Sequence, residues 1–354
     1  MAKSKPAVGL DIGSASVKLV QLKEKRGGYQ LLAYGSAPLP PEAIVDGALM
    51  NSAAIVQAIQ EVFAQQKVKA KEVAIGVRGH SVIIKKISLP RMTQEELDES
   101  IQWEAEQYIP FDVKDVNIDT QILTPPDVDT GTGQMDVLLV AAKKDMINDY
   151  TSVCAEAGLT ATVVDVDAFA VQNAYEASYE LGAADTVVIV NVGAAVTNLN
   201  VISRGVTTFT RDITMGGNAF TEEIQKQLNI SYDEAEALKV GGQGDSDAVV
   251  PQEVERVIQG VAEQLGGEIQ RSLDFYASTA PDGKITRAIL SGGTARVPAL
   301  FKTLEGRAGV PVEILNPFKN IEIDNKKFDP AVLLAAAPAA AVGVGLALRR
   351  PGDK

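Results

Sequence analysis

Residues Val8–Leu19 read VGLDIGSASVKL, and this stretch decides the fold. An apolar run enters a turn of glycine and small residues, and a second alternating run begins after it. This pattern predicts two antiparallel strands joined at Gly13. The same pattern returns 180 residues later, where Val188–Leu199 reads VIVNVGAAVTNL. One strand–turn–strand unit is common in proteins, but two of them half a chain apart predict two related lobes facing a single cleft.

The first turn carries the residue types that a phosphate site needs. Backbone N–H groups of a glycine turn converge on one point and hold an anion there. Gly13 allows close approach, and the hydroxyls of Ser14 and Ser16 add donors. Lys18 begins the second strand, within reach of a β- or γ-phosphate. Asp11 ends the first strand and is placed to hold Mg²⁺ through water, since Mg²⁺ retains much of its hydration shell. We therefore expect the phosphates of a nucleotide and Mg²⁺ here.

Two further motifs complete the expected nucleotide site. The turn of the second lobe grips the same phosphates, with Asn191 at the position that matches Asp11. Near the end of the chain, the sequence SGGTAR lies between a strand and a helix, where backbone without side chains forms a wall for a purine and an arginine stacks on it. The residues of these motifs are Gly193, Ala194, Ala195, Gly292, Gly293, Thr294 and Arg296. Neither GxxxxGK[ST] nor GxGxxG occurs at these turns, which argues against P-loop and dinucleotide sites.

Composition excludes several classes of function. The 354 residues include one cysteine and one histidine, so a disulfide within the chain, a thiolate metal cluster, a Ser-His-Asp triad and a histidine zinc site lack the residues they need. The net charge of -13 argues against nucleic acid and anionic lipid as partners, because both attract a positive surface. With no secretory signal and no cysteine pair, we expect a cytoplasmic protein.

Strands and helices alternate along the chain, which predicts α/β architecture. A capping box of Thr93 and Glu96 opens a helix whose apolar face continues to Ile109 and which ends at Pro110. A polar break at Gly241–Asp247 interrupts an otherwise helical region. The other expected elements are strands at Val8–Asp11, Val17–Leu22, Tyr29–Tyr34, Val73–Val77, Val82–Leu89, Gln134–Ala142, Val163–Asp167, Thr186–Val192, Thr197–Ser203, Val206–Asp212 and Ile285–Leu290, and helices at Ala53–Gln66, Lys144–Ala157 and Ala168–Leu181.

One segment is long enough to cross a membrane. Ala331–Leu348 reads AVLLAAAPAAAVGVGLAL, without a charged residue. It consists mostly of alanine and glycine, which gain little from hydrocarbon, and Pro338 lies inside it. These features favour a helix buried in the protein core over a membrane span.

The three glycine motifs, in this order, resemble the phosphate-1, phosphate-2 and adenosine motifs of the actin/hexokinase/Hsp70 ATPase superfamily. Within it the chain resembles the PilM family of type IV pilus assembly proteins, relatives of the cell-division actin homologue FtsA. The likeness spans essentially the whole chain and is carried by LDIGSASVKLVQL (Leu10–Leu22), IQWEAEQYIPFDVKDV (Ile101–Val116), DVDAFAVQNAYE (Asp165–Glu176), AEALKVGG (Ala235–Gly242), ILSGGTARVPAL (Ile289–Leu300) and AVGVGLALR (Ala341–Arg349).

The resemblance implies an actin-like, two-lobed α/β fold with a ribonuclease H-like duplicated core and an FtsA-type 1C subdomain. Subdomain 1A is expected at residues 1–79, completed by 156–184 and 331–354, and 1C at residues 80–155. Subdomain 2A is expected at residues 185–220, completed by 284–330, and 2B at residues 221–283.

The same resemblance implies further nucleotide contacts. Gly216 and Gly217, which open a helix that runs to Leu228, are expected near the nucleotide. Glu236 and Lys239 resemble the pair that contacts the ribose, although a surface ion pair at i,i+3 spacing explains them as well.

One departure from the family pattern bears on hydrolysis. Many relatives carry Asp at the second phosphate turn, where this chain has Asn191, and an amide supplies no charge to place Mg²⁺ and the attacking water. Asp165 and Asp167 are candidates for orienting water, although a helix-capping role is equally consistent. Because phosphoryl transfer depends on positioning and charge compensation, we expect ATP binding with slow or absent turnover.

The resemblance also implies a partner. A cytoplasmic scaffold of the type IV pilus machine is expected to dock the N-terminal cytoplasmic peptide of the inner-membrane protein PilN in a groove between 1A and 1C. It would reach the membrane only through such partners and contact other inner-membrane and motor components, with self-association also open. Candidate anchors, which also suit a subdomain core, are Trp103, Tyr108, Ile109, Pro110 and Phe111.

Two other functions fit the same fold. An FtsA-like filament-forming ATPase is expected to carry an amphipathic membrane-targeting helix at its C-terminus, and the tail Arg349–Lys354 (RRPGDK) is too short for one. A small-molecule kinase needs a substrate loop in the first lobe, where residues 80–155 instead resemble a compact insertion.

Overall fold

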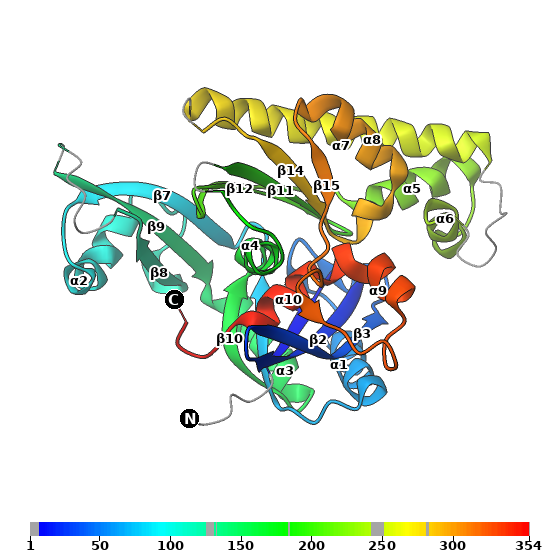
Figure 1. Cartoon of the computed structure of the whole chain (residues 1–354), viewed down its shortest axis with the longest axis horizontal. Helices are drawn as coiled ribbons and strands as arrows, with labels where there is room; N and C mark the ends of the chain where they lie inside the picture. The colour runs from blue at the N-terminus through cyan, green and yellow to red at the C-terminus, as the bar shows by residue number, and fades with distance from the viewer. Residues whose placement is uncertain are drawn as a thin grey trace.

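The computed structural model describes residues 7–124, 131, 133–182, 185–241, 251–280 and 283–353. Most of the polar break expected at Gly241–Asp247 lies outside the described residues. Figure 1 shows two lobes, one built on each of two sheets, and a smaller unit that projects beside the upper lobe. The architecture is α/β, as the alternation of strands and helices predicts, and it has the two lobes that the duplicated hairpins predict.

The sheet of the first lobe has six strands with mixed directions. Strand β1 pairs antiparallel with β2 and parallel with β6, and β6 pairs parallel with β10. The spatial order is β10 (Thr160–Val166), β6 (Glu72–Val77), β1 (Ala7–Ile12), β2 (Ser16–Lys25), β3 (Gly28–Pro38) and β16 (Ile321–Glu322). Strand β16 joins this sheet beside β3, although the expected division assigned its residues to the second lobe.

The second sheet repeats this topology. Strand β11 pairs antiparallel with β12 and parallel with β14, as β1 does with β2 and β6. The spatial order is β13 (Val206–Ile213), β12 (Thr197–Ser203), β11 (Thr186–Val192), β14 (Arg287–Ser291) and β15 (Val312–Ile314). The duplication seen in the sequence is therefore confirmed as a duplicated sheet.

Helices cover the outer face of each sheet. In the first lobe, α1 (Ser52–Gln66) and α3 (Lys144–Glu156) share a buried apolar cluster with β1, β2 and β6, next to a short hairpin of β4 (Ile44–Val45) and β5 (Ala48–Leu49). In the second lobe, the apolar cluster includes residues of four helices, α5 (Gly217–Leu228), α6 (Tyr232–Lys239), α7 (Gln252–Thr279) and α8 (Pro298–Ala308). Within the described residues, α6 packs on α5 and α7 and not on the sheet.

Two helices lie between the sheets, α4 (Asp167–Ser178) and α10 (Ala341–Leu348) (Figure 1). One apolar cluster joins both of them to β6 of the first sheet and to β11 and β14 of the second. Because this cluster belongs to both lobes, it sets how the lobes face each other.

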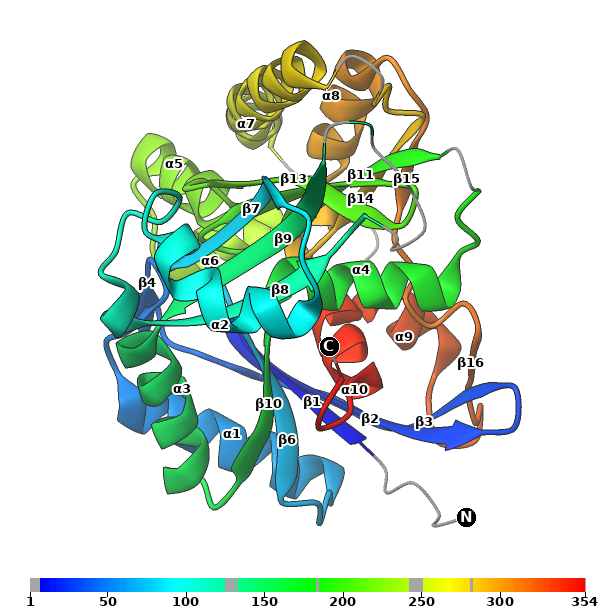
Figure 2. The same ribbon diagram turned by 90° about the vertical axis from the view of Figure 1, so that its left-hand side faces the viewer.

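Residues 80–155 contain a third sheet of three antiparallel strands in the order β7 (Val82–Pro90), β9 (Gln134–Lys143) and β8 (Val116–Ile122). Figure 2 looks onto α2 (Gln94–Ala105), which lies across this sheet. The capping box of Thr93 and Glu96 is present. The helix ends earlier than expected, because a residue before proline disfavours helical backbone and Ile109 turns into the core of the insertion. We refer to β7–β9 and α2, with the short helix η1 (Val113–Asp115), as the inserted unit.

The uncharged C-terminal segment is packed inside the protein, as expected. Residues Pro330–Leu348 are long and apolar enough to cross a membrane, but 61% of the most apolar window is buried within the molecule. The expected single helix is wrong, because Pro338 cannot supply a helical N–H bond and the segment divides into three pieces. These are α9 (Pro330–Ala336), the 3₁₀ helix η3 (Ala337–Ala340) and α10.

The glycine residues of this apolar segment, which make it resemble a membrane helix, serve close packing in the folded protein. A Cβ atom added at Gly345 would lie 1.7 Å from the Ala170 carbonyl oxygen of α4, and one added at Gly9 of β1 would lie 2.1 Å from the Gly343 carbonyl oxygen. The backbones of α10, α4 and β1 therefore touch directly. Small residues in α10 allow close packing between the lobes.

We predict that Gly345→Ala destabilises the fold by about 3 kcal/mol, because the added methyl overlaps backbone that cannot move without separating α10 from α4. Gly306→Ala is the matched control. Gly306 lies in α8 with open space around it, so alanine there gains up to about 1 kcal/mol of helix propensity. Urea unfolding followed by circular dichroism measures both variants. Equal stabilities for the two variants would contradict the packing described.

Candidate functional site

Both glycine turns line one cleft between the lobes, with a volume of about 1010 Å³. This is the arrangement on which the sequence interpretation depends. The cleft is lined by all but two of the residues predicted to hold nucleotide or to act in catalysis, namely Asp11, Gly13, Ser14, Ser16, Lys18, Asp167, Asn191, Gly193, Ala194, Ala195, Gly217, Glu236, Lys239, Gly292, Gly293, Thr294 and Arg296. The two that do not line it are Gly216 and Asp165.

The turns match in hydrogen bonding as well as in sequence. The Gly13 N–H donates to the Ser16 carbonyl at 3.1 Å, and the Gly193 N–H donates to the Val196 carbonyl at 3.0 Å. Each turn is therefore a four-residue loop closed by one bond. The next residues along each turn, Ser14 and Ala15 in the first and Ala194 and Ala195 in the second, line the cleft.

The second turn is held by its carbonyl groups. The Gly217 N–H donates to the Gly193 carbonyl at 2.9 Å, and the Thr294 hydroxyl donates to the same oxygen at 2.9 Å. The start of α5 and the motif after β14 thus fix the turn from behind. Gly216 supports this contact without lining the cleft, since a Cβ there would lie 2.6 Å from the Gly193 oxygen. Gly292 has a φ of +89°, which favours glycine at this position.

The pair expected at the ribose joins α6 to α5. Lys239 Nζ lies 2.6 Å from the Glu236 carboxylate and donates to the Thr221 hydroxyl at 3.0 Å. It also donates to the Gly217 carbonyl at 3.2 Å. Both members line the cleft, so the i,i+3 ion pair and a position suited to the ribose occur together.

Charges of opposite sign meet at the first turn. Lys18 Nζ lies 3.1 Å from the Asp11 carboxylate. Arg78, which the sequence interpretation missed, contacts the Asp167 carboxylate, approaches the other oxygen of Asp11 at 3.6 Å, and donates to the Ile12 carbonyl at 2.6 Å. Arg78 follows β6, so its place beside the ends of β1 and β10 is a consequence of parallel strand pairing. Its place directly after a predicted parallel strand is the sequence signal that could have identified Arg78 as a site residue.

Burial shifts the proton affinities of these groups. Burial raises the pKa of Asp167 to about 6, even though the Arg78 guanidinium opposes this, and the charge on Asp11 adds to the rise. Burial acts to lower the pKa of Arg78, but Asp167, Tyr150 and Asp11 outweigh it and the pKa is raised. The guanidinium is therefore a permanent charge in the cleft.

Asp165 does not reach the cleft. Its carboxylate lies 3.1 Å from Nε of Arg349 and accepts a hydrogen bond from the Val166 N–H at 2.7 Å. It does not cap α4, whose first residue is Asp167. Asp165 thus ties β10 to the residue after α10, and its assignment as a water-orienting carboxylate does not fit its position.

A second residue missed by the sequence analysis connects the lobes beside the cleft. Asp212, near the end of β13, accepts from the Gly79 N–H at 3.2 Å and from the Asn198 amide at 2.6 Å. Gly79 belongs to the link between β6 and the inserted unit. Asp212 therefore joins the second sheet to the first lobe at the entrance of the inserted unit.

The cleft fits a nucleotide with a water-bridged cation. Its volume accommodates a ligand of this size. One buried oxygen of Asp11 accepts no hydrogen bond within the described chain, which is the state expected of a group that meets a ligand or its water. No group of three or more His, Cys, Asp or Glu residues suited to a metal occurs within the ranges described, so direct protein ligation of Mg²⁺ is not indicated.

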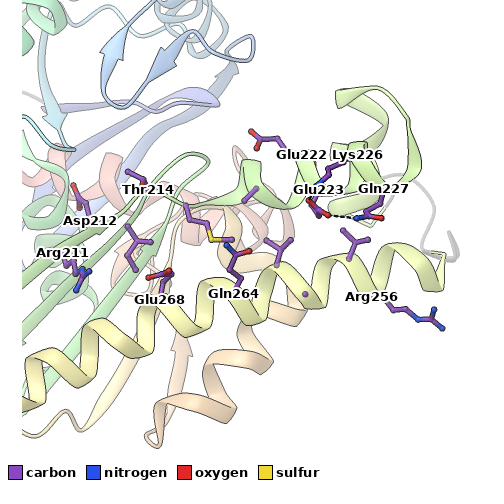
Figure 3. A pocket seen from close by; sticks show the side chains of 16 residues that line it. Arg211, Asp212, Thr214, Glu222, Glu223, Lys226, Gln227, Arg256, Gln264 and Glu268 are labelled. Atoms are coloured by element: carbon purple, nitrogen blue, oxygen red, sulfur yellow. Dashed lines mark hydrogen bonds and ion pairs between the residues drawn. The ribbon is translucent and has the colours of Figure 1, made fainter.

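A second groove, of about 940 Å³, lies between α5 and α7 (Figure 3). Its walls carry both signs of charge, with Glu223 accepting from Gln227 at 2.7 Å and lying 3.6 Å from Lys226. Glycine turns do not line it. The interlobe cleft is therefore the better phosphate site.

The predicted partner residues divide between surface and core. Trp103 on α2 is 77% exposed, and Pro110 is exposed. Ile109 is 6% exposed and belongs to the core of the inserted unit, so it is not available as an anchor. Tyr108 and Phe111 are half-buried against that core. Neither the interlobe cleft nor the groove of Figure 3 is lined by any of these residues.

Two duplicated sheets around a glycine-lined cleft define the actin-like ATPase class. The chain is similar to MreB 5 of Spiroplasma citri bound to AMPPNP, with a TM-score of 0.55, 13% identity, and coverage of 97% of this chain and 95% of that one, a likeness of fold alone. It is also 24% identical over 361 residues to the cell division protein FtsA of Enterococcus hirae, covering 90% of this chain and 79% of that protein.

A family model described as type IV pilus assembly protein PilM matches residues 9–351. A chain of a solved PilM–PilN type IV pilus biogenesis complex is 29% identical, with a TM-score of 0.87 and coverage of 98% of this chain and 99% of that one. The chain belongs to the PilM family of type IV pilus assembly proteins. It is an actin-like pilus assembly scaffold.

The raised pKa of Asp167 predicts a pH-dependent stability. The pKa of Asp167 is about 6 in the folded protein and 3.8 in the unfolded chain. Between these two pH values the folded protein retains a proton that the unfolded chain has released. The stability that this retained proton gives the folded protein is complete below pH 3.8 and is lost as the pH rises through about 6. Relative to wild type, the free energy of unfolding of Asp167→Asn should rise by up to about 3 kcal/mol between about pH 4 and pH 7.5.

Urea unfolding across that pH range measures the difference between Asp167→Asn and wild type. Asp149→Asn, at an exposed position of α3, matches the change in net charge and serves as the control. A difference between Asp167→Asn and wild type that is constant with pH would contradict the buried state described for Asp167.

Proposed function

We propose that this chain binds ATP in the interlobe cleft and uses the nucleotide-bound lobes as a platform for the N-terminal cytoplasmic peptide of PilN. The observation that carries the nucleotide proposal is the pair of matched turns, closed by the same hydrogen bond and lining one cleft. The complex named for a similar chain, PilM with PilN, supports the choice of partner.

Each lobe contributes differently to phosphate binding in this proposal. The turn at Gly13–Ser16 supplies backbone donors and hydroxyls, and Lys18 supplies the cation nearest to them. The turn at Gly193–Val196 supplies neutral donors alone. Mg²⁺, when bound, compensates the triphosphate charge, and Asp11 is the residue that would hold its water.

The adenosine end is assigned to the other motifs. Gly292 and Gly293 offer backbone without side chains at the cleft wall, and the exposed guanidinium of Arg296 is placed to stack on a purine. Glu236 and Lys239 are assigned to the ribose hydroxyls, since together they offer an acceptor and a donor at the cleft.

Slow or absent hydrolysis is part of the proposal. Asn191 supplies no charge at the second turn, and the Asp167 carboxylate is engaged by Arg78 instead of being free to orient water. Positioning and charge compensation supply most of the rate in phosphoryl transfer, so both features lower it. The nucleotide then serves to hold the lobes together.

The peptide is assigned to the inserted unit. Trp103 is the large apolar side chain most exposed among the described residues, and it lies on α2, whose first turn carries Glu95 and Glu96. An exposed aromatic that becomes buried on binding supplies much of the affinity of a short peptide. Through such a partner the chain would act in the cytoplasm at the inner membrane and reach other pilus components. The likeness to FtsA makes a self-associating, filament-forming ATPase the second candidate.

We predict that Lys18→Ala weakens ATP binding by about ten- to a hundredfold, since it removes a cation beside the phosphates and leaves Asp11 with only the more distant Arg78, at 3.6 Å, to offset its charge. Isothermal titration calorimetry with Mg²⁺ measures the change. Lys25→Ala is the matched control, because Lys25 lies on the same strand and pairs with Glu322 away from the cleft. Wild-type protein without affinity for ATP would refute the proposed nucleotide function.

We predict that the PilN peptide binds the ATP-loaded protein and that Trp103→Ala weakens this binding at least about tenfold, because hot-spot tryptophans contribute about 2 kcal/mol or more. Phe275→Ala, at an aromatic of α7 that is 54% exposed, is the control for a surface aromatic elsewhere. Fluorescence anisotropy of the labelled peptide gives both affinities. Binding that is unaffected by Trp103→Ala would remove the inserted unit from the docking site.

A further inference from the structure

A row of polar residues crosses the second sheet at the cleft. Asn191 of β11 lies opposite Asn198 of β12, and Asn198 in turn lies opposite Asp212 of β13. All three line the cleft, and Asp212 also lines the groove of Figure 3. The matching row of the first sheet, on β1, β2 and β3, consists of Asp11, Lys18 and Ser36. The second lobe therefore keeps a carboxylate at the cleft, but on the third strand of its row instead of the first.

The Asp212 carboxylate forms hydrogen bonds in both lobes. Its Oδ1 accepts from the side-chain amide of Asn198 at 2.6 Å, within the second sheet. Its Oδ2 accepts from the backbone N–H of Gly79 at 3.2 Å. Gly79 belongs to the first lobe, because it follows β6 and Arg78. Asn198 thus orients a carboxylate that reaches across to the opposite lobe.

The donor at Gly79 is held in place from both sides. Arg78, the residue before it, donates to the Ile12 carbonyl at 2.6 Å. The Gly79 carbonyl accepts from the Val82 N–H at 2.9 Å. Gly79 itself is buried and has a φ of +86°, a conformation that favours glycine. Its N–H is therefore aimed at Asp212 by the chain around it and loses little freedom when the bond forms.

This bond crosses between the lobes beside the cleft. The lobes also meet at the apolar cluster of α4 and α10, where close packing sets their separation. In the proposed function a nucleotide is gripped from both lobes, so its release requires the two walls of the cleft to separate. Because the bond ties Asp212 on one wall to the residue after Arg78 on the other, it breaks before the nucleotide leaves. Its acceptor is charged, which makes it stronger than a bond between neutral groups.

We propose that Asp212 is a positioning residue that holds the two lobes closed on a bound nucleotide and thereby slows its release. The inference rests on the proposed nucleotide function and adds how the nucleotide is retained. Asn198 supports this role indirectly, by orienting the carboxylate. The carboxylate of the second lobe thus serves closure of the cleft, at a position where Asn191 supplies no charge for hydrolysis.

Other roles for Asp212 give different kinetics. If its charge acted on the phosphates alone, its removal would relieve repulsion, and ATP would leave more slowly. If it only braced the second sheet, its loss would lower stability without a selective effect on release. Faster release is the result expected when the link between the lobes is lost. The dissociation rate constant of the nucleotide is therefore the quantity to measure.

Stopped-flow fluorescence measures this rate constant when excess ATP displaces N-methylanthraniloyl-ATP from the full chain in Mg²⁺. Asp212→Ala should raise it at least about tenfold. Asn198→Ala, which keeps the net charge, should raise it by less. The double variant should release no faster than Asp212→Ala alone, because Asn198 acts through Asp212. Asp185→Ala is the control, since that carboxylate accepts from the Gly182 N–H at 3.0 Å and pairs with Arg287 outside the cleft.

Hydrogen exchange of the Gly79 amide, followed by NMR, tests the link itself. In wild type, added ATP should slow this exchange, because closed lobes keep the bond to Asp212 formed. A carboxylate that instead contacted the nucleotide or water on Mg²⁺ would also slow release, but ATP would then leave the exchange of Gly79 unchanged.

The outcomes separate this inference from the function on which it rests. Wild type that binds no ATP analogue refutes the nucleotide function itself. Binding with a release rate that Asp212→Ala leaves unchanged or lowers overturns the role of Asp212 and leaves nucleotide binding intact. Additive effects of the two substitutions, or Gly79 exchange that ignores ATP, overturn it as well. If circular dichroism melting shows that Asp212→Ala does not fold, Asn198→Ala and the Gly79 amide of wild type still decide the question.

Discussion

Direct backbone contact between α10, α4 and β1 is the constraint on which the rest of the structure depends. Glycine at positions 9, 343 and 345 lets the chain of one element touch the next, and any larger side chain would separate them. The cluster that includes α4 and α10 is shared by both sheets, so the lobes meet at a fixed separation. The two glycine turns consequently face the same space. The cleft between them therefore depends on the packing of α10, α4 and β1 between the lobes.

The duplicated core does not give a symmetric site. At matched positions, the first hairpin pairs Asp11 with Lys18, and the second pairs Asn191 with Asn198. At the two turns, the first lobe therefore carries charged side chains, with Arg78 directly after β6 beside them, while the matched positions of the second turn are neutral. Such a division suits a site that retains a nucleotide, because strong binding needs donors on both sides whereas hydrolysis needs charges arranged around the attacking water.

Much of this could be read from the sequence, and the failures have physical reasons. The glycine turns were recognisable because local backbone geometry requires glycine and small residues there. Arg78 was missed because its role comes from the pairing of β1, β6 and β10, which are distant in sequence. Asp165 was misassigned because its partner, Arg349, follows a helix almost two hundred residues later along the chain. Pro338 was visible in the sequence, but the long uncharged run around it suggested one continuous helix, which the structure divides at that proline.

Family membership and the site argument are independent, because the first rests on similarity along the whole chain and the second on hydrogen bonds and charges in one cleft. They agree on an actin-like protein whose central cleft suits a nucleotide. Hydrogen exchange of the full chain with and without ATP tests this centre most directly. The account predicts that amides of Ser14–Ser16 and of Ala194–Val196 slow together when ATP is added. Protection of one turn alone, or of neither, would contradict it.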